Sequence, residues 1–454
     1  MERAPSVLII MADQMRWLDM GCAGGRAKTP ELDRLGQEGI LATHCYANTP
    51  VCGPSRASFF TGTHSMRHRI VINDLPLAAD DVTIGEVARD AGYETAYVGK
   101  WHLDGVPRSK FTPPGPRRHG FEYWAVHNCT HQYFHPRYYR DEPTMIEVEG
   151  YEPHVQTDLM LEFLNGLDDR RPFLGVLSWG PPHDPYDQVP REFQDLYDIN
   201  SLDPLPNVDV DDVRKNPLVR RLTVAQMTRD YYAAYSALDA EVGRLVRHLD
   251  ELGRSRDTIV CFVSDHGDML GAHGYLFKQQ PYEESVRIPL ILRWPDGLPE
   301  GSTDDQLIGV VDLAPTLLGL AGLPVPTEFQ GSDLSRSLGR GDPGADALLL
   351  ASVVSFSQSF MQGVPEWRGV RTARHTYVET VGRTPWLLFD NENDPWQMNN
   401  LVSEEADQAT RAQLGDALSR LLQETGDPFE PQEVMVDQLG WREAWDSLQT
   451  KGYD

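Results

Sequence analysis

Short apolar runs that alternate with helical patterns constrain the fold of this 454-residue chain more than any other feature. Residues 7–11 form a continuous apolar run, Val-Leu-Ile-Ile-Met, and similar runs recur at 95–98, 172–178 and 258–263. Such runs are typical of strands that are buried on both faces of a sheet. The helical patterns between them cover residues 29–35, 83–91, 155–167 and 226–252. This alternation predicts βαβ units, and therefore an α/β fold with a large, mostly parallel central sheet flanked by helices.

The last quarter of the chain follows a different pattern. Residues 331–346 are rich in Gly, Ser, Asp and Arg, which favours a boundary there. The patterns that follow predict three short strands and one helix, at residues 348–354, 369–372, 376–380 and 404–423. We therefore expect a main domain over residues 1–335 and a smaller α+β C-terminal subdomain, with a short antiparallel sheet, over residues 336–454.

The charge of the chain excludes several classes of partner. Its 41 Lys and Arg residues against 68 Asp and Glu residues leave a formal charge of -27. A field of that sign repels nucleic acid and anionic membrane surfaces, so we expect neither as a partner. A small anionic substrate would be repelled as well, unless its site gathers positive charge or holds a metal ion.

Targeting signals and cysteine usage predict the compartment. The apolar run at 7–11 is too short and wrongly flanked for a signal peptide, and no stretch approaches the roughly 18 apolar residues that a membrane helix needs. The cysteines are odd in number and lack zinc-site spacing, which fits a reducing compartment without structural disulfides. They are Cys22, Cys45, Cys52, Cys129 and Cys261. We expect a cytoplasmic protein.

Polar residues follow four of the predicted strands. They are Asp13, Lys100 with His102, His183, and Asp265 with His266. Ligands of open parallel sheets bind outside the carboxyl ends of the strands, so we expect these side chains at one edge of the sheet. Asp13 alone would be a turn residue, but with Asp265 it forms a carboxylate pair that suits Ca²⁺, Mg²⁺ or Mn²⁺. Gln14 and His266 adjoin the pair, and one imidazole shifts the preference towards Mn²⁺ or a softer ion.

The segment 50–62 contains a cysteine in an unusual position. Cys52 lies just before a predicted helix that begins near Pro54, and a helix N-terminus favours anions and lowers the pKa of a thiol. Arg56 adds a fixed cation whose planar fork suits sulfate or phosphate. From these residues alone, an anion site at Cys52 and a buried structural cysteine are equally favoured.

The motifs in and around this segment resemble those of a known family. Residues 52–56, Cys-Gly-Pro-Ser-Arg, with Thr-Gly at 61–62, resemble the signature of the type I, formylglycine-dependent sulfatases of the alkaline phosphatase superfamily. Other stretches resemble the family's remaining motifs in the same order, at residues 13–14, 99–103, 181–186, 264–268, 282–285 and 388–401. The resemblance implies an alkaline-phosphatase-like sandwich fold for the main domain and a sulfuric ester hydrolase activity.

The resemblance also implies a role for each site residue. Cys52 would be converted to formylglycine (3-oxoalanine), the nucleophile, by a formylglycine-generating maturation enzyme. The other catalytic side chains would be Arg56 and Lys100 at the formylglycine, His102 as the base, and His183 and Lys278 at the leaving group. One divalent metal ion would bind, Ca²⁺ in the first place and Mn²⁺ or another divalent ion otherwise. Its implied ligands are Asp13, Gln14, Cys52 in its modified form, Asp265 and His266.

The implied substrate is a small anionic ester, either a sulfated sugar or an aryl or alkyl sulfate. Many sulfatases have Asp where this chain has Gln14, and Asn where it has His266. The combination found here occurs in phosphonate monoester hydrolases and phosphodiesterases of the same family, which are the alternative function, and also in some bacterial sulfatases. A non-catalytic anion-binding relative is not favoured, because the catalytic side chains are present. A dinucleotide-binding enzyme is not favoured either, because no G-x-G-x-x-G follows the first predicted strand.

Several segments outside the motifs bear on the pocket and on assembly. Residues 113–119 and 200–217 are irregular, and we expect them to be surface loops that wall the pocket. The tail after Gly426 carries Trp441 and Trp445. We expect these side chains to pack on a neighbouring subunit, in which case the protein would be a homo-oligomer.

Several histidines and one tryptophan near the motifs could either pack in the core or contribute to the site. An aromatic stretch at 121–139 is more often core or lid than pocket lining, although its histidines could line the substrate pocket. Those histidines are His127, His131 and His135. We expect Trp101 to pack in the core and His273 to support the site.

Overall fold

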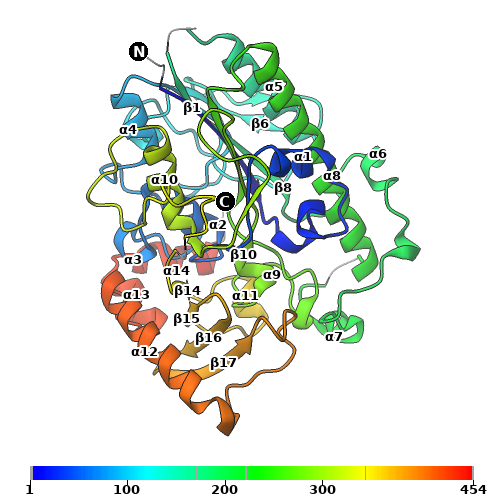
Figure 1. The fold of residues 1–454 in the computed structure, drawn as a ribbon, viewed down its shortest axis with the longest axis vertical. Helices are drawn as coiled ribbons and strands as arrows, with labels where there is room; N and C mark the ends of the chain where they lie inside the picture. Colours follow the sequence, from blue (N-terminus) through cyan, green and yellow to red (C-terminus); the bar gives the residue numbers. More distant parts are fainter. Residues whose placement is uncertain (1–3, 169–170, 220–221, 343, 452–454) are drawn as a thin grey trace.

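The computed structural model of the protein describes residues 4–168, 171–219, 222–342 and 344–451. Its centre is an eight-stranded sheet with the strand order β12-β2-β11-β9-β1-β8-β4-β5 (Figure 1). The strands are β1 (Ser6–Asp13), β2 (Ile40–Ala42), β4 (Glu94–Lys100), β5 (Tyr123–His127), β8 (Phe173–Pro182), β9 (Thr258–Ser264), β11 (Leu290–Arg293) and β12 (Ser302–Asp304). β1 pairs in parallel with β8 and β9, and β4 pairs in parallel with β5 and β8. β11 runs antiparallel to its neighbours, so the prediction of a mostly parallel sheet is confirmed.

Alternate side chains of β1 point into two hydrophobic cores, one on each face of the sheet. The core around Ile9 is closed by α2 (Cys52–Thr61), α4 (Ile84–Asp90) and α10 (Leu313–Leu320). The core around Ile10 is closed by α1 (Pro30–Gln37), α5 (Glu152–Asn165) and α8 (Val224–Glu251). Because both faces of β1 are buried, the strand is a continuous apolar run rather than an alternating one.

The predicted and observed helices differ mainly at their ends. The helix predicted at 226–252 begins at Val224, because Thr223 and Gln226 form a capping box that satisfies the first amides of α8. The prediction that residues 200–217 are irregular is wrong for α7 (Val210–Lys215). Val213 is the one buried residue of this short helix, so no apolar periodicity reveals it.

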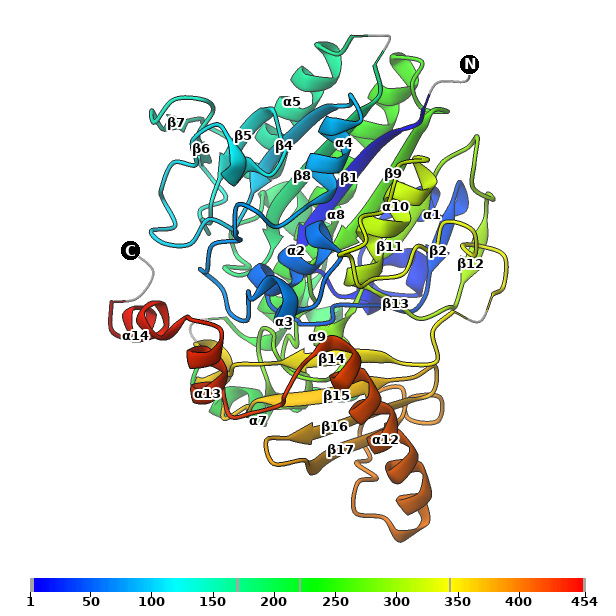
Figure 2. The same ribbon diagram turned by 90° about the vertical axis from the view of Figure 1, so that its left-hand side faces the viewer.

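A second, four-stranded sheet carries the C-terminal part of the chain (Figure 2). Its antiparallel strands are β14 (Leu348–Ser352), β15 (Trp367–Arg371), β16 (His375–Thr380) and β17 (Thr384–Asp390). The helix α12 (Gln408–Thr425) packs on one face of this sheet through Leu414, Leu418 and Leu422. The short antiparallel sheet was expected, whereas β17 was not, and the division into residues 1–335 and 336–454 stays a prediction.

The C-terminal tail packs on its own chain. It forms α13 (Gln432–Gln438) and α14 (Arg442–Lys451). Trp445 is buried, with its ring 5.5 Å from that of Phe356, and Trp441 Nε1 donates to the Arg69 carbonyl at 2.7 Å. Both indoles therefore have partners within the chain, and packing of the tail on a neighbouring subunit stays a prediction. Among the described residues, no helix is both long and apolar enough to cross a lipid bilayer.

Candidate active site

Four potential metal ligands meet at the carboxyl edge of the main sheet. The ligand atoms of Asp13, Cys52, Asp265 and His266 all lie within 4.8 Å of one another, and all four residues are buried. Asp13 ends β1 and Asp265 follows β9, and these two strands pair in register from Ser6 to Ala12. The sheet therefore places the two carboxylates side by side, and Cys52 reaches them from the N-terminus of α2.

Buried cations hold the carboxylates and favour an anion at position 52. Arg56 Nε donates to Asp265 Oδ2 at 3.0 Å, and the Lys100 ammonium is ion-paired with Asp13. The Cys52 sulfur lies 3.2 Å from Lys278 Nζ and 3.2 Å from His266 Nε2. Burial alone would raise the pKa of this thiol, but Lys100 and Lys278 hold it well below its usual range. This is the local positive charge that an acidic chain needs in order to bind an anion.

His102 is held by a buried carboxylate that sequence reasoning missed. Its Nε2 lies 3.2 Å from Asp74 Oδ1, and Arg108 donates to both oxygens of Asp74 at 2.7 Å. Burial alone would lower the pKa of His102, but the thiol of Cys129 and the Asp74 carboxylate raise it to about 10. Asp74 lies in a loop with φ 68° and belongs to no motif, so no local signal marks it.

His183 and Lys278 form a second side of the site, which contacts Gln14 and Cys52 through Lys278. Their Nε2 and Nζ atoms are 2.6 Å apart, and Lys278 Nζ also donates to Gln14 Oε1 at 3.1 Å. The ring of His131 stacks on that of His183 with centroids 4.6 Å apart and planes 14° from parallel. Lys278 therefore connects position 52 to the histidine pair, although neither histidine lies near it in the sequence.

The structure brings all ten predicted site residues into one buried cluster: Asp13, Gln14, Cys52, Arg56, Lys100, His102, His183, Asp265, His266 and Lys278. Of the other candidates, His131 stacks on His183 of this cluster, and the rest lie apart from it. His127 pairs with buried Glu152 at 2.8 Å, and His135 is exposed. His273 stacks on Tyr282 with ring centroids 4.0 Å apart, and Trp101 packs in the core, as expected of it.

The donor set fits a divalent cation. The pKa of Asp13 is low: burial and the Cys52 thiol raise it, but Lys100, His183 and Arg56 outweigh them, so the carboxylate is ionised. His266 Nδ1 lies 2.9 Å from the Gly267 carbonyl and must donate to it, which leaves Nε2 bare and able to ligate. Two carboxylates, one amide oxygen and one imidazole are a set that Ca²⁺ or Mn²⁺ can use.

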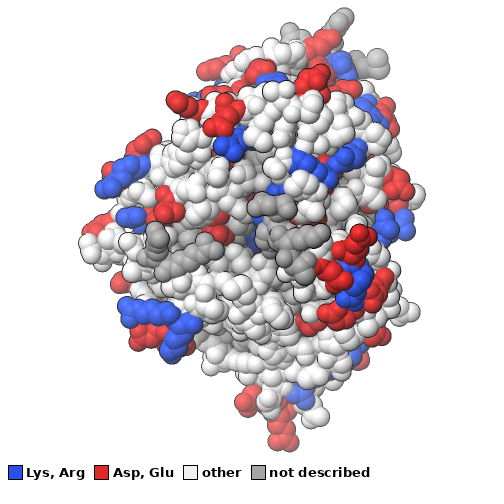
Figure 3. Space-filling model, turned by 180° about the vertical axis from the view of Figure 1, so that it is seen from behind, with Lys and Arg blue, Asp and Glu red and all other residues white. Residues whose placement is uncertain are grey.

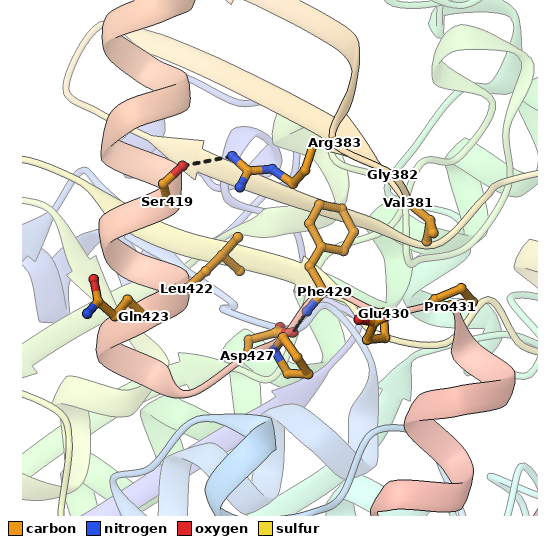
Figure 4. A pocket seen from close by; sticks show the side chains of 11 residues that line it. Val381, Gly382, Arg383, Ser419, Leu422, Gln423, Asp427, Phe429, Glu430 and Pro431 are labelled. Atoms are coloured by element: carbon orange, nitrogen blue, oxygen red, sulfur yellow. Dashed lines mark hydrogen bonds between the residues drawn. The ribbon is translucent and has the colours of Figure 1, made fainter.

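The two parts of the surface in Figures 3 and 4 show no competing anion site among the described residues. On the face shown in Figure 3, acidic and basic side chains are interspersed, and the described residues form no broad basic patch there. A hollow beside α12, shown in Figure 4, contains Arg383, but Glu379 and Ser419 already pair with that guanidinium. We therefore place the candidate site at the sheet edge.

Comparisons with known proteins identify the family of the chain. The family model described as Sulfatase matches residues 5–323, and the model described as N-sulphoglucosamine sulphohydrolase, C-terminal, matches residues 271–424. An ulvan-active sulfatase of Formosa agariphila is 35% identical over 445 residues, covering 96% of this chain and 84% of the relative.

Solved structures agree as well. The yidJ protein of Bacteroides fragilis has a TM-score of 0.82 at 31% identity, covering 94% of this chain and 97% of the other. The structure of BT4656 in complex with its substrate D-glucosamine-2-N,6-O-disulfate has a TM-score of 0.83 at 26% identity, covering 95% and 100%. The phosphonate monoester hydrolase of Agrobacterium radiobacter shares the fold, with a TM-score of 0.76 at 22% identity over 93% and 96% of the two chains.

Proposed function

This chain belongs to the sulfatase family of sulfate ester hydrolases, and from that premise we propose that it hydrolyses sulfate esters of carbohydrates through a formylglycine made from Cys52. One observation carries the proposal. Cys52 lies at the N-terminus of α2, 3.2 Å from the Lys278 ammonium, beside two carboxylates that end adjacent parallel strands. The formylglycine would be produced by a maturation enzyme, which is the macromolecular partner that we propose.

The carbohydrate part of the proposal rests on the relatives. One acts on ulvan by name, and another is solved with a sulfated glucosamine as its substrate. We extend the class, a sulfated sugar, to this chain, without extending either particular sugar. We also propose that residues 1–335 form the catalytic domain and that residues 336–454 form the smaller subdomain.

A metal ion would be held by Asp13, Gln14, residue 52, Asp265 and His266, with Ca²⁺ as the first candidate and Mn²⁺ as the second. When bound, such an ion polarises the sulfate oxygens and stabilises a nucleophile. Arg56 holds the Asp265 carboxylate in place through a hydrogen bond of 3.0 Å, and Lys100 holds Asp13 through an ion pair. These buried pairs orient the ligands before substrate arrives.

The remaining side chains divide the proton transfers. His183 and Lys278 would meet the departing oxygen, because Lys278 Nζ lies 3.2 Å from the Cys52 sulfur and 2.6 Å from His183 Nε2. Burial and Lys278 act to lower the pKa of His183, but Asp184 and Asp13 raise it. At a separation of 2.6 Å, His183 Nε2 and Lys278 Nζ can hold only one proton between them, so the pair would supply the proton that a leaving alkoxide needs. His102 would act at position 52, held there by Asp74.

Gln14 and His266 keep phosphonate monoester hydrolysis as the second candidate, since phosphonate hydrolases share this fold. The deciding measurement is the ratio of kcat/KM for an aryl sulfate to that for the matching aryl phosphonate monoester. The protein is co-produced with a formylglycine-generating enzyme, and a Cys52→Ala variant is the control. A ratio well above one with an inactive control supports the sulfatase proposal, and a ratio well below one replaces it with the second candidate.

A further inference from the structure

The Gln14 amide can have only one orientation. Its Nε2 donates to Asp268 Oδ2 at 2.7 Å, and its Oε1 accepts from Lys278 Nζ at 3.1 Å. A carboxylate can only accept hydrogen bonds, and an ammonium can only donate them. Turning the amide over would place donor against donor at Lys278 and acceptor against acceptor at Asp268. The amide oxygen therefore faces the cluster, where a metal would take it as a ligand.

Asp268 is itself fixed by four donors. Its Oδ2 accepts from Tyr186 OH at 2.7 Å in addition to Gln14 Nε2. Its Oδ1 accepts from the backbone amides of Leu270 at 2.8 Å and Phe277 at 3.2 Å. The residue is fully buried, so these bonds leave the carboxylate no room to rotate. Every donor is a neutral group, and the two backbone amides hold Oδ1 independently of any side chain.

We infer that Asp268 is a positioning residue that makes Gln14 an oxygen ligand of the metal, and that the two residues work as an exchangeable pair. The inference rests on the metal site of the proposed function but not on the substrate. A carboxylate at position 14 would face the Asp268 carboxylate at hydrogen-bond distance, acceptor against acceptor, with neither group able to donate. Position 14 can therefore carry a carboxylate only if position 268 becomes a donor.

Asp268→Asn is the isosteric test of this pair. The backbone amides of Leu270 and Phe277 would retain the asparagine oxygen, so its NH2 group would face Gln14. Gln14 would then turn its oxygen towards Asn at 268 and its NH2 towards the metal, which removes one ligand. Changes of this kind typically weaken metal binding by about 10- to 100-fold. In the double variant Gln14→Glu with Asp268→Asn, the carboxylate would accept from the asparagine NH2 and still present an oxygen to the metal.

The experiment is calorimetric titration of Ca²⁺, and separately Mn²⁺, into the full-length metal-free protein. We expect Asp268→Asn and Gln14→Glu each to weaken binding by about 10- to 100-fold, and the double variant to return to within about 3-fold of the wild type. Tyr186→Phe removes the other donor to Asp268 Oδ2 while leaving Gln14 oriented, so its affinity should stay within about 2-fold. Thermal unfolding without metal checks that each variant is folded.

The outcomes separate this inference from the proposed function. Restoration in the double variant supports the pair, whereas wild-type affinity in Asp268→Asn, or a double variant no better than the single ones, overturns it. A wild-type protein that binds neither ion also overturns it. Aryl sulfate hydrolysis is assayed on the same preparations, so a protein that binds metal and shows the restoration but cleaves no sulfate would refute the proposed function while the pair stands.

Discussion

The two sides of the site are built from different parts of the fold. On the nucleophile side, Asp13 and Asp265 come from paired strands, and Cys52 and Arg56 lie one turn apart on α2. On the leaving-group side, the side chains come from loops distant in sequence, among them those that carry His131, His183 and Lys278. Regular elements fix the reacting groups to within fractions of an ångström, whereas loops can change between relatives without disturbing them. The difference indicates that chemistry is set by the first side and substrate choice by the second.

The largest predicted effect removes the nucleophile. We expect Cys52→Ala to lower kcat/KM on an aryl sulfate by on the order of 10⁵-fold, because the remaining side chains can only bind and polarise the ester. Cys22→Ala is the matched control, since that thiol is half-buried beside Asp33, outside the cluster. Activity of Cys52→Ala within about 100-fold of the wild type would show that the nucleophile lies elsewhere.

Next in size is a change that breaks the framework of the same side. Arg56→Met leaves Asp13 and Asp265 as buried carboxylates without their guanidinium, so we expect the free energy of unfolding to fall by about 3–5 kcal/mol in the absence of divalent metal. Added Ca²⁺ should recover part of this loss, because the ion supplies the missing positive charge. The exposed pair of Arg89 with Asp90 provides a control, since Arg89→Met should cost less than about 1 kcal/mol. Denaturant unfolding with and without metal gives both values, and equal losses at the two arginines would contradict the argument.

On the leaving-group side, the effect should depend on the alcohol that departs. We expect His183→Ala to lower kcat by about 10²- to 10³-fold on a sugar sulfate, whose alkoxide needs a proton, and by about 10-fold or less on a sulfate ester of an acidic phenol. Measuring kcat over a series of leaving groups tests the contrast. A loss that is the same for all leaving groups would assign His183 to the nucleophile side instead.

Acid should loosen the nucleophile side first. Burial, assisted by His64, lowers the pKa of His68 from 6.5 to about 3, and the ring spans Ser58 of α2 and the amide of Ile70. Its depressed pKa stabilises the fold above pH 6.5, and that contribution is lost as the pH falls towards 3. The expected loss between pH 6.5 and pH 4 is about 2–3 kcal/mol. His68→Gln should flatten the pH dependence of unfolding, while exposed His135→Gln should leave it unchanged.

The contrast between the two sides also explains what the sequence could predict. The strands at 7–11 and 258–263 are continuous apolar runs, so the sheet and the carboxylates after it followed from local patterns. Asp74 gave no such signal, and Asp268, although it ends the motif at 264–268, gave none for its partner. The roles of the two residues depend on His102 and Gln14, which lie 28 and 254 residues away. Tertiary packing brings such distant hydrogen-bond partners together, and a single sequence does not show which residues will meet.

The prediction of secondary structure missed elements for the same reason, where the local sequence pattern was weak or matched two interpretations. The motif at 388–401 begins inside β17, and its residues were interpreted by the motif rather than as part of a strand. The residues of β17 pair with β16 across a turn, and Leu387 and Leu388 enter two different cores. The alternation is short, and Pro385 interrupts it, so periodicity alone did not reveal the strand.

The smallest predicted effect concerns His131, the residue that should distinguish substrate choice from chemistry most cleanly. Its ring stacks on His183 and lies half-buried, so its outer face is available to the bound alcohol. Replacing it by Ala removes one packing surface without removing a charge, because burial lowers the pKa of His131 and favours the neutral ring. We expect KM for a sugar sulfate to rise by about 3- to 10-fold while kcat for a small aryl sulfate stays within about 2-fold. A kcat that falls with every substrate while KM stays constant would instead make His131 a support for His183, and would move the boundary between the two sides by one residue.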